Sequence, residues 1–307
     1  MGAAVSRALV EFLAGVVPAE NIRQQEPMAE HTTFRVGGPA EVFVTVDDRE
    51  QLGKVIRYLN LTGWPYFLLG NGSNLLVGDK GYRGVVIRLG REFEHVKTEG
   101  NRLTCGAAVS MARAAKTAME NSLSGLEFAS GIPGSVGGGV RMNAGAYGGE
   151  LGELVESVVV MAKDGSLMEL DNDTMEFSYR RSVLKDRPYA VLEVTMKLSE
   201  GDREEILARM NDLAAKRKQK QPLEYASAGS TFKRPEGYFA GKLIMDAGLR
   251  GARIGGARVS EKHCGFVIND GTATAADIAE LIGEVSEKVK ERFGVSLEPE
   301  VIFLGDF

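Results

Sequence analysis

A glycine-rich stretch at residues 125–149 has the backbone pattern best suited to binding a ligand. It holds nine of the chain's 38 glycines. Glycine reaches conformations that other residues avoid, and its missing side chain lets main-chain N–H groups approach a ligand closely. Successive N–H groups that point into one concavity bind phosphate oxygens. A flexible linker is the alternative, but apolar residues such as Leu126, Phe128 and Val140 stand where a linker would carry serine and glutamine. We expect an ordered loop system that binds an anion.

A second glycine-rich patch, Gly-Asn-Gly-Ser-Asn, occupies residues 70–74 and follows a short apolar run. Asn-Gly favours left-handed turns, and Ser73 and Asn74 add side-chain donors. Alone, this patch would be a tight turn between two strands. Two such patches suggest a ligand with a diphosphate and a large ring system. Neither patch matches G-x-G-x-x-G or G-x-x-x-x-G-K-[ST], which argues against a dinucleotide-binding Rossmann domain and a P-loop NTPase.

Six short motifs follow one another between about residue 25 and the C-terminus. They are His-Thr-Thr-Phe-Arg-Val-Gly-Gly at 31–38, Gly-Asn-Gly-Ser-Asn at 70–74, Gly-Ile-Pro-Gly-Ser-Val-Gly-Gly at 131–138, Phe-Ser-Tyr-Arg-Arg-Ser at 177–182, Ser-Ala-Gly-Ser-Thr-Phe-Lys at 227–233 and Leu-Glu-Pro-Glu-Val at 297–301. Each motif alone is weak, whereas six in order are specific. Together they resemble the UDP-N-acetylenolpyruvoylglucosamine reductase family, whose members complete UDP-N-acetylmuramate for peptidoglycan and cell-wall synthesis.

The resemblance implies an α+β protein with an FAD-binding fold of the vanillyl-alcohol-oxidase/PCMH type in two lobes, followed by a C-terminal α+β lobe that binds substrate. It implies non-covalent FAD and NADPH as the hydride donor. The implied FAD contacts are Gly70, Asn71, Gly72, Ser73, Asn74, Ser130, Gly131, Ile132, Pro133, Gly134, Gly137, Gly138, Asn143 and Gly145.

Three residues match the family's catalytic positions. The implied reaction delivers hydride to the terminal enolpyruvyl carbon, so negative charge develops on the adjacent carbon and spreads into the carboxylate. Arg180 matches the arginine that holds this carboxylate, Ser230 matches the proton donor, and Glu300 matches the third catalytic residue. Without the resemblance, these residues would be interpreted as a surface arginine, a turn serine and a strand-end charge.

Four further residues are implied to contact substrate. Tyr179 adjoins the catalytic arginine, and Arg217 and Lys220 match basic residues that face the nucleotide diphosphate. Lys233 or Lys220 could stabilise the alkoxide left by Ser230. One subclass of the family carries an extra tyrosine-bearing loop, for which residues 165–189 leave no room. The chain therefore resembles the shorter subclass without that loop.

The composition excludes several classes of partner. The 307 residues are 44% hydrophobic and 26% charged, as in ordinary globular proteins, and the net charge of −5 gives no basic field for nucleic acid. No apolar run approaches the ~18 residues of a membrane span, and Glu11 interrupts the only candidate for a signal peptide. We expect a cytoplasmic monomer that binds small-molecule substrates, without nucleic-acid partners or a membrane anchor.

The cysteines and histidines do not form a metal site. Cys105 and Cys264 have neither metal-ligand nor disulfide spacing, and the three histidines are scattered. Cys264 follows His263, which raises the alternative of a nucleophile beside its base. Adjacent residues on a strand point to opposite faces, so we interpret both as structural.

The expected elements place these motifs in three parts. A leading helix over 5–15, with Val5, Leu9, Phe12 and Leu13 at helical spacing, lies in residues 1–20. The FAD-binding domain covers 21–213, with lobes at about 21–80 and 81–213, and the substrate-binding domain covers 214–307. Strands are expected at 41–46, 65–69, 85–89, 102–105, 155–162, 166–170, 189–198, 265–269 and 301–304, and helices at 50–60, 109–121, 202–221, 241–247 and 275–293.

Two rival functions remain open from the sequence. The first is a flavin oxidase of the same binding architecture, with O₂ as the acceptor and His31 as the nearest residue for covalent flavin attachment. Rapid reoxidation in air without substrate would favour it. The second is a non-catalytic nucleotide-sugar binder, which a colourless purified protein would favour.

Overall fold

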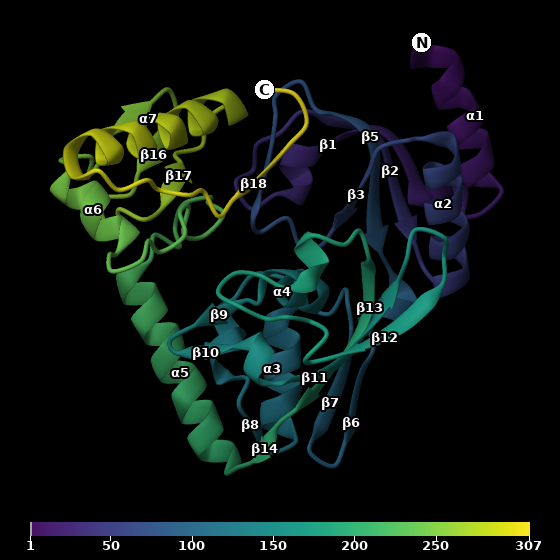
Figure 1. The fold of residues 1–307 in the computed structure, drawn as a ribbon, viewed down its shortest axis with the longest axis horizontal. Helices are drawn as coiled ribbons and strands as arrows, with labels where there is room; N and C mark the ends of the chain where they lie inside the picture. The colour runs from purple at the N-terminus through teal and green to yellow at the C-terminus, as the bar shows by residue number, and fades with distance from the viewer. Residues whose placement is uncertain (1) are drawn as a thin grey trace. The chain divides into compact units, whose positions relative to one another are not determined.

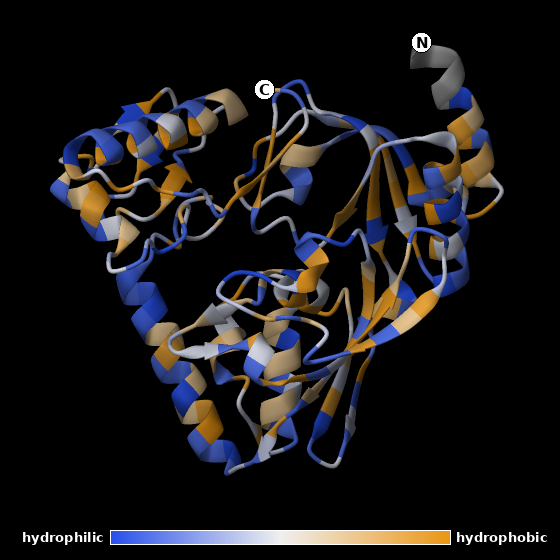
Figure 2. Cartoon of the chain, viewed as in Figure 1, coloured by the Kyte–Doolittle hydropathy of each residue, from blue (hydrophilic) through white to orange (hydrophobic). Residues whose placement is uncertain are grey.

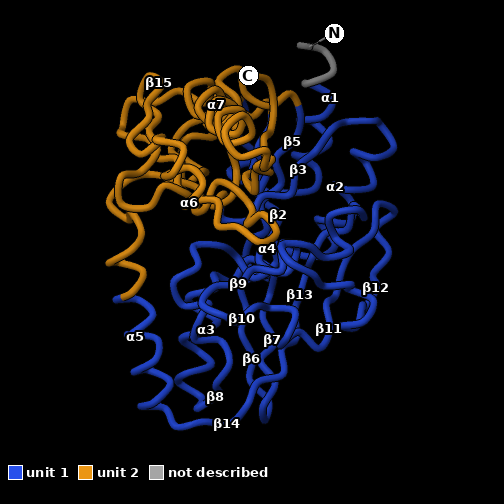
Figure 3. Tube along the Cα trace, turned by 60° about the vertical axis from the view of Figure 1, so that its left-hand side comes forward, with its two compact units in different colours: residues 1–24, 42–71, 84–215 blue, residues 25–41, 72–83, 216–307 orange. Residues whose placement is uncertain are grey.

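The computed structural model describes residues 2–307, with side chains from Arg7 onward. The chain forms two compact units that alternate along the sequence (Figure 3). Unit 1 comprises residues 1–24, 42–71 and 84–215, and unit 2 comprises residues 25–41, 72–83 and 216–307. The predicted domain limits, 21–213 and 214–307, stay predictions.

The first sheet has the strand order β1-β2-β5-β3 and belongs mainly to unit 1 (Figure 1). Its strands are β1 (Ile22–Pro27), β2 (Pro39–Val46), β3 (Tyr66–Leu69) and β5 (Tyr82–Leu89), and β3 runs parallel to β5. Helix α2 (Arg49–Thr62) connects β2 to β3 and begins where the Asp48 side chain accepts a hydrogen bond from the Gln51 N–H. The predicted strand-helix-strand arrangement is confirmed.

The leading helix α1 (Gly2–Ala14) packs on this part of unit 1. Leu9 and Leu13 are fully buried, and the Phe12 ring stacks on the Tyr58 ring of α2 with 3.7 Å between centroids. The predicted apolar stripe is confirmed at these positions, while Val5 lies outside the described side chains.

The second sheet of unit 1 is antiparallel, with the order β12-β11-β13-β7-β6. Its strands are β6 (Val96–Glu99), β7 (Arg102–Gly106), β11 (Val155–Met161), β12 (Leu167–Asp171) and β13 (Ala190–Lys197). Helix α3 (Met111–Glu120) shares a core with this sheet. Cys105 on β7 is completely buried, and burial raises the pKa of its thiol to about 12. This thiol is therefore structural.

The glycine-rich stretch contains a helix that the sequence did not predict. Helix α4 (Val136–Met142) follows a 3₁₀ turn at Glu127–Gly131 and precedes a hairpin of β9 (Gly145–Ala146) and β10 (Gly149–Glu150). The Ser135 hydroxyl accepts a 3.3 Å hydrogen bond from the Gly138 N–H and caps the helix. A Cβ on Gly137 would lie 2.8 Å from the Ala107 Cβ, and one on Gly139 would lie 2.9 Å from Leu151. Glycine is needed here for close packing.

Unit 2 is built around a three-stranded antiparallel sheet and a long helix. The sheet contains β15 (Arg253–Ile254), β16 (Ala257–Val259) and β17 (Val267–Asn269), and α6 (Ala240–Asp246) and α7 (Ala275–Phe293) share a core with it. Strand β4 (Leu75–Val77) pairs in parallel with the closing strand β18 (Ile302–Leu304). The predicted helix over 275–293 is confirmed at both ends.

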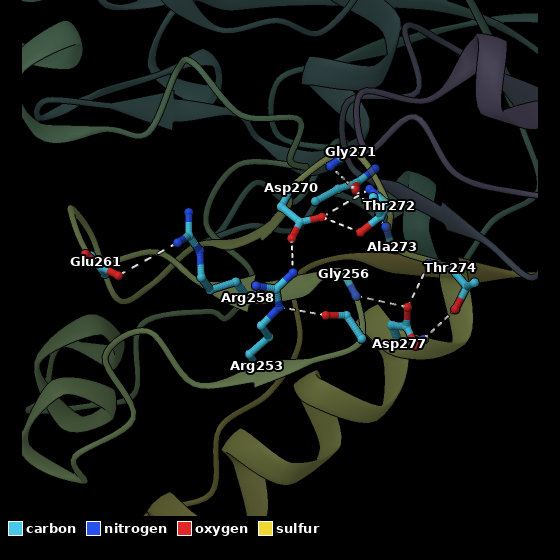
Figure 4. Close-up of polar contacts among 12 residues, drawn as sticks. Arg253, Gly256, Arg258, Glu261, Asp270, Gly271, Thr272, Ala273, Thr274 and Asp277 are labelled. Carbon is cyan, nitrogen blue, oxygen red and sulfur yellow. Dashed lines mark hydrogen bonds and ion pairs between the residues drawn. The ribbon is translucent and has the colours of Figure 1, made fainter.

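Polar contacts at the start of α7 connect it to the β15–β16 hairpin of unit 2 (Figure 4). The Asp277 carboxylate accepts hydrogen bonds from the N–H groups of Thr274 at 2.9 Å and Gly256 at 3.3 Å. The bond from Thr274 helps hold the pKa of Asp277 below its ordinary value. Arg253 pairs with Asp270 beside them. The carboxylates of Asp270 and Asp277 therefore have structural roles in unit 2.

Among the strands and α-helices of residues 2–307, there remain two short paired strands, β8 (Leu123–Ser124) and β14 (Ser199–Glu200), and the helix α5 (Arg203–Lys220). Helix α5 is mostly hydrophilic (Figure 2), and Ile206 is its buried residue. None of the helices between residues 2 and 307 combines the length and apolar character needed to cross a bilayer.

Candidate functional site

Two of the predicted FAD-binding segments meet within unit 1. The Asn71 side-chain amide donates a 3.3 Å hydrogen bond to the Pro133 carbonyl. A Cβ on Gly70 would lie only 2.6 Å from the Ser135 hydroxyl, so the two segments approach closely where Gly70 has no side chain. The structure thus brings residues 70–71 next to Pro133 and Ser135, which are about 60 positions away in the sequence. That these segments bind FAD stays a prediction.

The glycine-rich segment also offers unused donors. Ser135 is 2% exposed, and its main-chain N–H, like that of Gly134, makes no hydrogen bond within residues 2–307. A buried N–H group without a partner costs free energy unless a ligand or water accepts from it. Gly131 and Gly138 are exposed beside these donors. A diphosphate fits such a site, because its oxygens accept hydrogen bonds and need a close approach to the backbone.

Replacing Gly138 by valine is expected to give folded protein that binds FAD at least about tenfold more weakly, a factor worth about 1.4 kcal/mol. A Cβ at Gly138 would lie 3.3 Å from the Ser135 hydroxyl, a tight contact that a small shift of this side chain would relieve. We therefore expect the fold to tolerate the change, whereas the added side chain would block the ligand's approach to the backbone. Gly131→Val should behave similarly. FAD affinity is measured by titrating the apoprotein, and circular dichroism checks the fold. Gly283→Val is the matched control, because Gly283 is also helical and exposed, with nothing within 4 Å of its Cβ position. Unchanged affinity in both glycine variants would contradict this prediction.

In unit 2, the rest of the second glycine-rich patch, residues 72–74, contacts the segment before the closing strand. Gly72 has φ +61°, and a Cβ there would lie 1.9 Å from the His31 carbonyl oxygen, so this glycine is required by the fold. The Asn74 amide donates a 2.9 Å bond to the main-chain carbonyl of Glu300. The neighbouring Thr33 hydroxyl is buried and has no partner among the described residues. FAD contacts by Gly72, Ser73 and Asn74 stay predictions.

Ser230 and Glu300 come together within unit 2. The Glu300 N–H donates a 2.8 Å hydrogen bond to the carbonyl of Thr231, the residue after Ser230. Thr231 is fully buried; its N–H donates to the Gly265 carbonyl at 2.8 Å, and its hydroxyl accepts from the Val267 N–H at 2.9 Å. Ser230 itself is exposed. The serine is thus presented on a loop whose next residue is fixed on two sides.

The predicted basic residues of unit 2 have different surroundings. Lys233 forms an ion pair with Glu298, a partner that the sequence analysis missed, and its N–H donates to the Glu298 carbonyl at 2.9 Å. Arg217 and Lys220 lie in the last turn of α5, where Lys220 is exposed and Arg217 partly buried. Their substrate-binding roles stay predictions.

Arg180 occupies a strained turn in unit 1. Ser178 and Arg181 exchange two main-chain hydrogen bonds of 3.0 Å, which closes a two-residue turn of Tyr179 and Arg180. Arg180 has φ +56°, in the left-handed region that glycine usually occupies at this turn position. Its guanidinium donates to the Gly145 carbonyl at 2.9 Å and lies 5.1 Å from the centre of the half-exposed Tyr179 ring. A strained backbone conformation costs free energy and persists only where the surrounding structure enforces it. Such residues are common at functional sites.

The other candidate groups have structural surroundings. His263 and Cys264 lie in a turn before β17, so the strand argument for them was wrong, although a structural interpretation agrees with their contacts. The His263 Nδ1 accepts a 3.1 Å bond from the Gly265 N–H, and burial raises the pKa of Cys264. His31 contacts the Glu26 carboxylate at 2.8 Å. Within residues 2–307, no three His, Cys, Asp or Glu side chains group so as to hold a metal ion.

Comparison with known proteins matches both parts of the chain to family models. The model of the FAD binding domain matches residues 40–171, and that of the C-terminal domain of UDP-N-acetylenolpyruvoylglucosamine reductase matches residues 221–304. The chain is 48% identical over 306 residues to the UDP-N-acetylenolpyruvoylglucosamine reductase of Lachnoclostridium phytofermentans, covering 98% of this chain and 99% of that relative.

Solved structures agree with this match. The UDP-N-acetylenolpyruvylglucosamine reductase (MurB) of Thermus caldophilus is 39% identical, with a TM-score of 0.80 over 92% of this chain and 99% of that one. A glucose dehydrogenase, Phl p 4.0202, shares only the fold, at 13% identity and a TM-score of 0.50 over 63% of this chain and 44% of its own. The predicted α+β fold class with an FAD-binding domain is confirmed. The chain belongs to the UDP-N-acetylenolpyruvoylglucosamine reductase family of FAD-dependent oxidoreductases.

Proposed function

We propose that this protein reduces the enolpyruvyl group of UDP-N-acetylglucosamine enolpyruvate with NADPH and so forms UDP-N-acetylmuramate for peptidoglycan. The observation that carries this proposal is the Ser230 loop, whose next residue is hydrogen-bonded to Glu300, in a chain of this family. When bound, FAD supplies the hydride, which it receives from NADPH. Gly134 and Ser135 of the glycine-rich segment would hold its diphosphate.

The chemistry of the substrate defines what the side chains must do. Hydride addition to the terminal carbon converts the double bond to a single bond and leaves an electron pair on the carbon that bears the ether oxygen. This charge spreads into the neighbouring carboxylate. A guanidinium held against that carboxylate stabilises the growing charge bidentately, which is the role proposed for Arg180. A proton must then reach the charged carbon.

Ser230 is the proposed proton donor. A serine hydroxyl is a weak acid, so a cation near it must stabilise the alkoxide. Lys220 or Lys233 could supply this charge, although Lys233 also pairs with Glu298. Glu300 would orient a water or assist at the carboxylate end, and Tyr179 and Arg217 would contact substrate. Residues 165–189 hold β12 and turns, in keeping with the shorter subclass.

An absorbance spectrum of the purified protein tests the proposal. We expect a flavin spectrum that NADPH bleaches and that the enolpyruvyl substrate restores under anaerobic conditions. Acid precipitation should release the flavin into solution, since the proposed FAD is non-covalent. Rapid reoxidation by air without substrate would instead favour the flavin oxidase, and colourless protein the non-catalytic binder. We also propose a cytoplasmic monomer, which sedimentation and fractionation would test.

A further inference from the structure

The C-terminal end of helix α4 holds the turn that carries Arg180. Asn143, the residue after α4, is completely buried, and its side-chain amide donates a 3.0 Å hydrogen bond to the Ser178 carbonyl. The same carbonyl accepts the Arg181 N–H at 3.0 Å, which closes the turn. Asn143 therefore bonds to the one carbonyl that defines the turn.

Asn143 is itself fixed from the other side. Its side-chain oxygen accepts a 2.8 Å hydrogen bond from the Gly152 N–H, so both ends of the amide are in use. Its backbone has φ +44° and ψ +58°, the left-handed conformation that asparagine tolerates better than most residues. The side chain is completely buried and is held from both sides, by Ser178 and by Gly152. The FAD contact that the resemblance implied for Asn143 stays a prediction.

Two further contacts join the end of α4 and the residues after it to the turn and to the residue that follows the turn. The Ser182 hydroxyl, fully buried, donates to the Arg141 carbonyl at 2.9 Å, and the Arg180 guanidinium donates to the Gly145 carbonyl at 2.9 Å. Three residues at the end of α4 and just after it, Arg141, Asn143 and Gly145, thus contact the chain before, at and after Arg180. A strained arginine needs such support, because its left-handed backbone would otherwise relax.

We infer that Asn143 is a positioning residue for Arg180, acting through its bond to the Ser178 carbonyl. This inference rests on the proposed role of Arg180 in holding the substrate carboxylate. Loss of the bond leaves the guanidinium charge in place but allows the turn to shift. A misplacement of about 1 Å costs up to about 10²-fold in rate.

Asn143→Asp tests the inference, because aspartate keeps the acceptor for Gly152 and replaces the donor to Ser178 by an oxygen. In holoenzyme, we expect substrate-driven flavin reoxidation to slow by about 10- to 10²-fold, with weaker substrate binding to the oxidised enzyme by calorimetry. FAD content and reduction by NADPH should not change. Asn60→Asp is the control: the Asn60 amide also donates to main-chain carbonyls, those of Ile56 and Lys163, and it contacts neither the turn nor Gly152. It should leave both measurements as in the wild type.

A double-mutant cycle separates positioning from a general structural effect. If Asn143 acts through Arg180, Asn143→Asp should slow reoxidation by less than about twofold in an Arg180→Ala background. A factor of about two is the usual error of such a comparison, so a smaller change counts as no effect. The same loss in both backgrounds, or wild-type rates in Asn143→Asp, would overturn the inference. Asn143→Gly, which keeps the left-handed backbone, is the second variant; loss of FAD from both would favour a cofactor role instead. Full activity of Arg180→Ala alone would refute the proposed role of Arg180 and with it this inference, whereas wild-type protein without reductase activity would refute the proposed function.

Discussion

Ser230→Ala is expected to leave flavin reduction by NADPH nearly unchanged and to slow reoxidation by the enolpyruvyl substrate by roughly 10²–10⁴-fold, the usual cost of losing a general acid. The first half of the reaction takes no proton from this loop, whereas the second delivers one to the substrate carbon. Stopped-flow absorbance of the flavin follows each half separately. The fold should not suffer, because Ser230 is exposed and the loop is fixed by the buried Thr231.

Two variants make this experiment decisive. Ser230→Cys places a more acidic proton at nearly the same position and should restore part of the rate of flavin reoxidation by substrate. Ser227→Ala makes the same change three residues earlier in the loop, at a residue without an assigned role, and should behave as the wild type. Equal slowing of both halves in Ser230→Ala would mean that the serine shapes the flavin site. No slowing in either half would mean that the proton comes from another group.

The sequence could predict the elements whose signals are local. Helix α7 has an apolar stripe, a Thr274–Asp277 capping box and Gly294 after its last residue, and its predicted limits were correct. Helix α2 has the same kinds of signal. Helix α4 was missed because three of its seven residues are glycine, which disfavours helices. The only local signal for this helix was Ser135, which caps it. A serine before a run of glycines indicates a loop equally well.

The geometry of the candidate site depends on contacts that no local pattern encodes. The pairing of β4 with β18 joins segments more than 200 positions apart, and it brings Asn74 to Glu300. The left-handed backbone of Arg180 results from the hydrogen bonds that its neighbours make. The conformational preference of arginine could not have predicted it. The resemblance supplied the identities of Arg180, Ser230 and Glu300, but it gave no sign that Asn143 supports the turn.

Arg180→Ala is expected to slow substrate-driven reoxidation by roughly 10²–10³-fold, the scale for loss of one oriented donor at a developing charge. Arg181→Ala is the matched control: Arg181 is the next residue in the same turn, and its guanidinium pairs with Asp186 at 2.5 Å. Its removal should change the rate little. If both variants lose activity equally, the turn needs general positive charge and not a specific arginine.

Two other replacements of Arg180 separate its charge from its shape and its backbone. Arg180→Lys should recover only part of the rate, because an ammonium cannot hold a carboxylate bidentately. Arg180→Gly should be as inactive as the alanine variant. It should unfold at a higher temperature than the alanine variant, because glycine adopts the φ of +56° without strain. A lysine variant with full activity would reduce Arg180 to electropositive background. A glycine variant that is inactive but more stable would show that the fold accepts strain at this turn to keep a guanidinium there, as expected if that guanidinium binds the substrate carboxylate.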